Sequence, residues 1–310
     1  MSDLLHPFGY EFFRQAFAVS VLAGALCALV GTFIIVRGMA YLGHGLSHAV
    51  FGGFAVSAII GVNVVAGAAV WGIVVALLIG RVSRRRIVST DASIGVLTLA
   101  SFALGLALLQ WRPTATVNPE TALFGDVLGV SRTDLLGVAV VTVVAVVLVI
   151  SRYRTFVSVS VDPEVAAVSG LRVRRVDAVL LAMLAVAVLA AMNVMGATLV
   201  AAGVVVPPAT ARLLTHRFSR MLWLSTLFGA LGGAVGMIAS YHLDIASGPV
   251  IVLTESIGFG VAYAVSSILA IPRRHRSSSA EPPRSAPTPL PGPIPVDVAD
   301  RPEIDATRRP

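Results

Sequence analysis

Two histidines four residues apart, His44 and His48, lie inside an apolar stretch of the sequence. Four residues make about one turn of an α-helix, so both imidazole rings are expected on one helical face. Imidazole nitrogens are common ligands for zinc, manganese and iron-class ions. The spacing therefore predicts a metal-contacting pair. In the alternative interpretation, one ring hydrogen-bonds a neighbouring carbonyl and the other lies near an interface with water.

Three further ionisable residues lie in or beside apolar runs nearer the C-terminus. Asp244 occupies a turn between two such runs and is a candidate anionic ligand at the mouth of a pathway, with His242 close to it. Glu255 falls well inside the next run. An unpaired carboxylate there is costly, so Glu255 is expected to face a cavity, to pair or to stay protonated. His242 and Glu255 are therefore candidate pathway residues, although a hydrogen bond to a helix carbonyl or a serine would also satisfy Glu255.

The composition is that of a membrane protein. Of the 310 residues, 56% are hydrophobic and 13% are charged, about half the charge of a soluble domain. Apolar runs of close to 20 residues recur from Gln15 to Ile271, which predicts an all-α polytopic membrane protein with eight or nine transmembrane helices. The first run lacks a cleavage site and is expected to be retained. The expected spans are about 15–37, 43–61, 64–81, 93–110, 133–151, 177–195, 198–214, 221–242 and 249–271.

The arginines predict how these spans are oriented. Four clusters fall on one side of the predicted spans, and by the positive-inside rule that side is cytoplasmic. The clusters are Arg81, Arg84, Arg85 and Arg86; Arg152, Arg154, Arg172, Arg174 and Arg175; Arg212, Arg217 and Arg220; and Arg273, Arg274 and Arg276. Residues 1–14 are then an extracytoplasmic lead, 15–272 the transmembrane domain, and 273–310, rich in proline and serine, a disordered cytoplasmic tail. No nucleic-acid partner is expected.

Residue types that are rare or missing exclude two classes of site. The net charge of +7 comes with no lysine, and a Walker-type ATP site requires one, so an ATPase would have to be another chain. The single cysteine, Cys27, allows no disulfide framework and is expected to be an apolar filler. Nothing predicts a permanently bound cofactor.

One short segment has the start and stop signals of a separate helix. Asp162 precedes Pro163 and Glu164, and Gly170 follows, which predicts a helix capped at Asp162 and ended at Gly170. The segment lies in the longest expected cytoplasmic connection. Docking of another protein and simple closure of the loop both explain it. A similar argument makes Asp91 the expected N-cap of the fourth span.

Taken in order, these features resemble the permease subunit of bacterial ABC importers for zinc, manganese or iron, from Pro7 to about Ile271. The stretches that carry the resemblance are Pro7–Phe8 with Phe12–Ala16, Gly31–Thr32 with Val36–Ala40, Leu42–Gly43 with Ser47–Val50, Asp91 with Ile94–Gly95, Leu123–Asp126, Asp162–Glu164 with Ser169–Gly170, Val206–Pro207 with Ala211–Arg212, and Asp244 with Ser247–Leu253. Each stretch is weak alone; their order over nearly the whole membrane region is specific.

The resemblance implies a vitamin-B12-importer-like ABC permease in a bacterial cell membrane. It implies a homodimer, a cytoplasmic ABC ATPase that docks on the coupling helix at 162–170, and an extracytoplasmic metal-binding protein. Positions 44 and 48 become metal contacts, with Asp244 near the extracellular gate. The family usually has an aspartate where this chain has His44, and a second nitrogen ligand favours zinc over manganese.

Two other classes of protein share some of these sequence features with a metal importer. An intramembrane metalloenzyme of the zincin type would need glutamate directly after the first histidine, where Gly45 stands. An ion-gradient-driven secondary metal transporter would need buried acids for coupling, and Glu255 is the one deep acid seen in the sequence. A permease that is not itself an enzyme remains the principal prediction, with the secondary transporter as its alternative.

Overall fold

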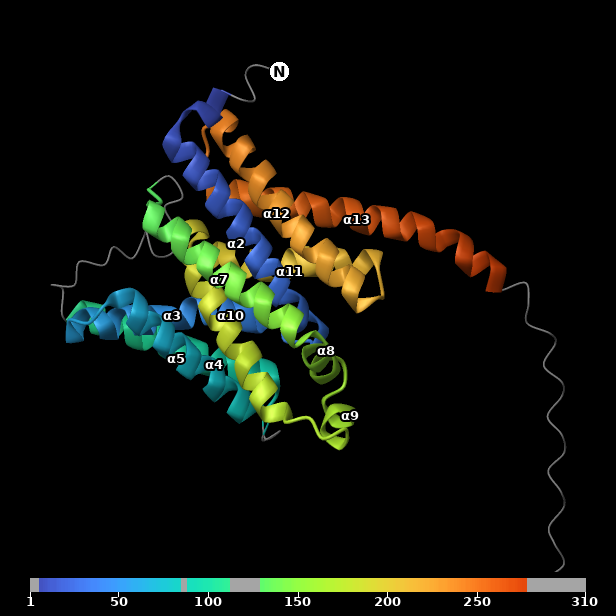
Figure 1. The fold of residues 1–310 in the computed structure, drawn as a ribbon, viewed down its shortest axis with the longest axis horizontal. Coiled ribbons are helices and arrows are strands. Elements are labelled where there is room, and N and C mark those ends of the chain that lie inside the picture. Colours follow the sequence, from blue (N-terminus) through green and yellow to red (C-terminus); the bar gives the residue numbers. More distant parts are fainter. Residues whose placement is uncertain (1–5, 85–87, 112–128, 278–310) are drawn as a thin grey trace, which may run out of the picture. The chain divides into compact units, whose positions relative to one another are not determined.

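The structure is a computed structural model that describes residues 6–84, 88–111 and 129–277. The chain divides into two units, 1–268 and 269–310, and the packing below is that of the first. Helices make up the described elements, and no β-strand occurs among them (Figure 1). They are η1 (His6–Gly9), α2 (Glu11–Val36), α3 (Tyr41–Ile60), α4 (Val64–Ser83), α5 (Thr90–Trp111), α7 (Arg132–Ser151), α8 (Tyr153–Val161), α9 (Pro163–Val168), α10 (Val173–Met195), α11 (Ala197–Leu214), α12 (Phe218–Leu243) and α13 (Ser247–Ser277).

Within the described ranges, eight helices are long and apolar enough to cross a membrane. They are α2, α3, α4, α5, α7, α10, α12 and α13. The predicted all-helical membrane fold is thus confirmed, whereas the seventh expected span is a shorter apolar helix, Val200–Leu214 within α11. Pro207 and Pro208 lie inside α11. Because proline has no N–H, the carbonyls four residues earlier, Gly203 and Val204, lose their usual helical donors.

Helices α2 and α12 pack side by side with their backbones in contact (Figure 1). A side chain on Gly24 would collide with the backbone of Gly229, and one on Gly229 would collide with Gly24. Nearby, the Ser225 hydroxyl donates a hydrogen bond of 2.9 Å to the Ala28 carbonyl. Small residues permit this approach, which is typical of helix pairs in membranes. The seam holds the two helices together over several turns.

The histidine-bearing helix α3 packs with α4 and α5. The Ser101 hydroxyl of α5 donates to the Ala49 carbonyl of α3 at 2.7 Å, and the Trp71 indole of α4 donates to the same hydroxyl at 2.8 Å. A Cβ on Gly105 would lie 3.0 Å from the Cα of Gly52. Three helices are therefore fixed around one serine, which sets the position of α3.

The short helix predicted after Asp162 is present as α9. The Asp162 carboxylate accepts hydrogen bonds of 3.0 Å from the backbone N–H groups of Glu164 and Val165, and Gly170 has a φ of +81° just past the end. Its cap and its stop are those that the sequence predicts. The helix before it, α8, was not predicted.

The cap predicted at Asp91 is wrong. Helix α5 begins at Thr90, and the Ala92 N–H donates to the hydroxyl of Ser89 at 3.2 Å. Asp91 lies in the first turn, where its negative charge faces the positive end of the helix dipole. Serine and aspartate cap about equally well, so the sequence alone did not discriminate between positions 89 and 91.

Several predicted segments fall wholly or partly outside the described residues. They are residues 1–5 of the extracytoplasmic lead, Arg85 and Arg86, the Leu123–Asp126 stretch, and 278–310 of the expected tail. Helix α13 continues to Ser277, so the first residues assigned to that tail are helical.

Candidate functional site

The rings of His44 and His48 lie together on one face of α3. Their centroids are 4.9 Å apart and their planes meet at 74°. His44 is exposed, and His48 is half-buried with its ring edge-on to Phe102 at 5.3 Å. The Nδ1 atom of His48 is buried and has no hydrogen-bond partner. A ring hydrogen bond to a neighbouring carbonyl, which the alternative interpretation proposed, is therefore not present at His48 Nδ1.

Two glycines allow the first turns of α3 to pack closely against its neighbours. A Cβ on Gly43 would lie 2.8 Å from the side chain of Val204 in α11, and one on Gly45 would lie 2.7 Å from Thr98 in α5. The segment bearing the histidines is thus held between α11 and α5.

Asp244 lies at the opposite end of the first unit from this pair. It ends α12 in a left-handed conformation, φ 55°, and its side chain is exposed. One turn earlier, the ring of Tyr241 packs edge-on to Phe13 at 5.3 Å. His242 is exposed beside it, with its ring 5.6 Å from that of Tyr241. The end of α12 is therefore level with the start of α2.

The separation between Asp244 and the histidines along the bundle can be estimated from the residues of α2 that lie level with each. Gly31 and Gly43 both contact Val204, so the histidine turn is level with Gly31. Phe13 and Gly31 are separated by about 27 Å of helical rise. Among the described residues no three His, Cys, Asp or Glu side chains gather where they could hold a metal ion. The structure thus brings His44 and His48 together and keeps Asp244 apart from them.

Glu255, the deep acid of the sequence, borders a cavity of about 170 Å³ between α11, α12 and α13. Its side chain is 6% exposed, and neither carboxylate oxygen has a hydrogen-bond partner. Of the outcomes expected from the sequence, the geometry fits a carboxyl group that faces a cavity.

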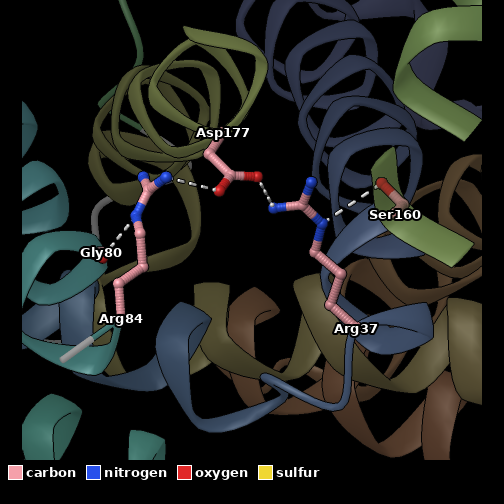
Figure 2. A network of polar contacts seen from close by, with 5 residues as sticks. All are labelled: Arg37, Gly80, Arg84, Ser160 and Asp177. Carbon is pink, nitrogen blue, oxygen red and sulfur yellow. Dashed lines mark hydrogen bonds and ion pairs between the residues drawn. The ribbon is translucent and has the colours of Figure 1, made fainter. Parts of the chain in front are cut away.

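A network of ion pairs and hydrogen bonds lies at the C-terminal end of α2, just before the histidine-bearing helix α3 (Figure 2). The Asp177 carboxylate pairs with Arg37 at 2.8 Å and with Arg84 at 3.1 Å. Arg37 also donates from Nε to the Ser160 hydroxyl at 3.3 Å, and Arg84 donates from Nε to the Gly80 carbonyl at 2.9 Å. The network joins α2, α4, α8 and α10 beside the α9 helix.

Sequence reasoning missed Asp177 and the role of Arg37. Asp177 is the only acid between Arg172 and Asp244, and it lies in the first turns of an apolar span. A lone acid at such a position next to arginine clusters is a usable signal for an ion pair. Its partner could not be read from the sequence, since Arg37 precedes it by 140 residues.

The α9 helix presents apolar side chains to its surroundings. Val165 is 61% exposed and Val168 is 91% exposed, whereas Ala166 is buried. Exposed valines on a six-residue helix are typical of a contact surface, because the helix has little core of its own to bury.

Comparison with known proteins agrees with this architecture. The family model described as "ABC 3 transport family" matches residues 9–266. The manganese transport system membrane protein MntC of Halalkalibacterium halodurans is 37% identical over 257 residues, which cover 83% of this chain and 88% of that protein. The chelated iron transport system membrane protein YfeC of Yersinia pestis is 34% identical, with 90% of this chain and 96% of that protein covered.

A solved structure shows the same likeness in three dimensions. The structure of PsaBC from Streptococcus pneumoniae in complex with Fab superposes with a TM-score of 0.76 at 29% identity, covering 84% of this chain and 95% of that chain. A family match over most of the chain, relatives above 30% identity and a shared fold lead to one conclusion. The chain is a multi-pass membrane protein that belongs to the ABC 3 transport family.

Proposed function

We propose that this chain is the membrane-spanning permease subunit of an importer for a divalent metal ion, manganese or zinc. ATP hydrolysis on a separate subunit drives the import. The observation that carries the proposal is the His44–His48 pair, with its unpartnered His48 nitrogen, in a chain whose relatives are named for manganese and iron transport. The metal is cargo, so contacts must be weak enough to release it.

The ion meets the candidate residues one after another. Asp244, exposed at the end of α12, is suited to an early electrostatic contact, since a carboxylate attracts a hydrated dication. The histidines lie about 27 Å further along and supply nitrogen ligands. An extracytoplasmic metal-binding protein delivers the ion, and a second copy of the chain completes the conduit. With two ligands per chain, a pair of copies would offer four imidazoles.

Helix α9 is the proposed contact with the ATPase. The capped start at Asp162 and Pro163, the acidic Glu164 and the turn at Gly170 hold a short helix whose valines are exposed. This surface supports a docking role over simple closure of the loop. The hydrogen bond from Arg37 to Ser160 of α8, next to α9, provides a physical connection towards α3.

Two observations bear on the choice of metal and pull in different directions. Two imidazoles favour zinc, because manganese prefers carboxylate oxygen. The relatives named for manganese favour manganese. The secondary-transporter alternative finds no support among the relatives.

Uptake by reconstituted vesicles tests the proposal. Vesicles containing the permease and its ATPase, supplied with the metal-loaded binding protein, should accumulate manganese or zinc only when ATP reaches the ATPase. The variant His48→Ala should lose at least tenfold in uptake rate, because it removes one of the two imidazoles proposed to contact the ion. His216→Ala is the matched control, since His216 lies in a loop after α11. Wild-type uptake by His48→Ala, or accumulation without ATP, would refute the proposal.

A further inference from the structure

The carboxyl group of Glu255 lies in a seat formed by a glycine. A Cβ on Gly232 of α12 would approach the Glu255 Cγ to 2.6 Å and the Oε1 to 3.0 Å. Only glycine at this position lets the carboxyl lie flat on α12. The side chain is thus held by packing, with both oxygens left unbonded in a 6% exposed position.

The lining of the cavity beside Glu255 is mostly apolar, and its polar side chains are those of Glu255, Thr210 and Thr254. The Thr210 hydroxyl donates to the Val206 carbonyl at 2.8 Å, and the Thr254 hydroxyl donates to the Val250 carbonyl at 2.8 Å. Both hydroxyl hydrogens are therefore used inside their own helices, and the oxygen lone pairs remain. Pro207, also in the lining, has no N–H to offer. The few polar atoms of this lining are therefore acceptors, which suit a cation better than an anion.

The depth of Glu255 lies between the two parts of the candidate pathway. Gly233, next to Gly232, packs against the backbone of Ser20 in α2. Ser20 is about 10 Å along α2 from Phe13, the level of Asp244, and about 16 Å from Gly31, the level of the histidines. Measured along α2, the level of Glu255 is therefore between the level of Asp244 and the level of the two histidines.

Helix α11 connects the cavity to the histidine helix. Val204 contacts Gly43 in α3, whereas Pro207 and Thr210, one and two turns further, line the Glu255 cavity. One helix, interrupted by its prolines, thus has the cavity on one face and the start of α3 on another.

We infer that Glu255, with Thr210 and Thr254, forms a cation-binding station for the transported dication between Asp244 and the His44–His48 pair. The inference rests on the proposed function for the identity of the cation. Oxygen-only donors suit a hard ion such as Mn²⁺. One carboxylate per chain gives weak, reversible binding, as a transport path requires. The cavity volume of about 170 Å³ also leaves room for waters that complete the ion's shell.

Manganese binding in the absence of the histidines tests the station directly. The full-length chain carrying His44→Ala and His48→Ala, in lipid nanodiscs, is titrated with Mn²⁺ up to about 1 mM, and the free ion is counted by electron paramagnetic resonance. One saturable ion per chain is expected, and adding Glu255→Gln should abolish it, whereas Glu255→Asp should retain part of it. The inference would be overturned if the double-histidine variant bound no saturable Mn²⁺, or if adding Glu255→Gln left its Mn²⁺ binding unchanged. Displacement of Mn²⁺ by 150 mM sodium would also overturn it, because the site would then serve a monovalent ion.

A pair of glycine variants separates geometry from charge. Gly232→Ala keeps the carboxylate but pushes it from its seat, so Mn²⁺ binding should weaken at least fivefold. Gly260→Ala, on the same helix as Glu255 with nothing near its Cβ, should bind as the parent does. Equal binding by both variants would count against the seat. Because this assay needs neither ATP nor uptake, it can fail while the vesicle experiment with His48→Ala succeeds, and the reverse.

Discussion

At the scale of single residues, His44 and His48 share a helical face but have different surroundings. His44 is exposed, with the Tyr41 ring 6.1 Å away, and His48 is half-buried against Phe102. A substitution at His44 is therefore expected to change the proposed metal contact with little effect on packing. A substitution at His48 alters both.

The variant His44→Asp should shift metal preference towards manganese. It replaces an imidazole nitrogen with the carboxylate oxygen that manganese prefers, so the ratio of manganese to zinc uptake should rise by about tenfold. Competitive uptake of the two ions in vesicles measures this ratio. His44→Gln, which supplies a neutral amide at the same position, is the control and should lower uptake of both ions. An unchanged ratio in His44→Asp would show that His44 does not select the metal.

The histidine pair could be predicted from its spacing, but the relation of the other site residues could not. A four-residue interval fixes two side chains on one helix. The depth of Asp244 depends on the pairing of α12 with α2, which is set by glycines more than 200 residues apart in the chain. Likewise, the sequence predicted that Glu255 would face a cavity, pair or stay protonated, and the cavity beside it depends on how α11, α12 and α13 pack together.

At the scale of helices, the Arg37–Asp177–Arg84 network holds four elements at one end of the first unit. The Arg37 and Asp177 side chains are 9% and 18% exposed, and Arg84 is 38% exposed. Arg37 is therefore the partner whose charge depends most on Asp177. Removing one member of a buried pair leaves an uncompensated charge and costs about 3–5 kcal/mol.

Asp177→Asn should lower the thermal unfolding temperature of the detergent-solubilised protein, because Arg37 then lacks its counter-charge. The double variant Arg37→Gln with Asp177→Asn should recover part of the loss, since no unpaired charge remains. Arg84→Gln, whose side chain is more exposed, should cost less than about 1 kcal/mol. Additive losses in the double variant would show that the two residues do not stabilise each other.

The helices that the sequence predicted least well are those whose patterns mislead. Helix α8 has the sequence YRTFVSVSV, in which apolar and polar residues alternate at its end as in a strand. It is helical because Phe156 and Val159 are buried against the helices it contacts. Helix α11 tolerates two prolines because close packing against Gly31 and Gly43 holds it in place. Tertiary contacts of this kind leave no local signal.

At the scale of the molecule, the contacts agree with the arginine pattern on which helix ends lie on the same side of the first unit. The network brings together the last residues of α2 and α4 and the first turns of α10. Asp244 and Phe13 mark the other end of α2. Arg37, Arg84 and the α9 helix therefore share one end, which the positive-inside rule assigns to the cytoplasm.

Cysteine labelling checks this orientation. In a Cys27→Ser background, Ser169→Cys next to α9 should react with a membrane-impermeant maleimide only after spheroplasts are permeabilised. Ala246→Cys, exposed beyond α12, should react in intact spheroplasts. The unmodified parent should give little signal, because Cys27 is buried. Labelling of Ser169→Cys in intact spheroplasts would contradict this orientation and indicate that α9 lies outside the cytoplasm.

The glycine seam between α2 and α12 restricts how such a permease can change conformation. With backbone touching backbone at Gly24 and Gly229, neither helix can roll about its own axis without a collision. The two helices are thus expected to move as a single stiff beam. A rearrangement that opens one side of the protein and closes the other must then change the contacts between this helix pair and its neighbours. Helix α11, in which two carbonyls lack helical donors, is the neighbour expected to bend most easily.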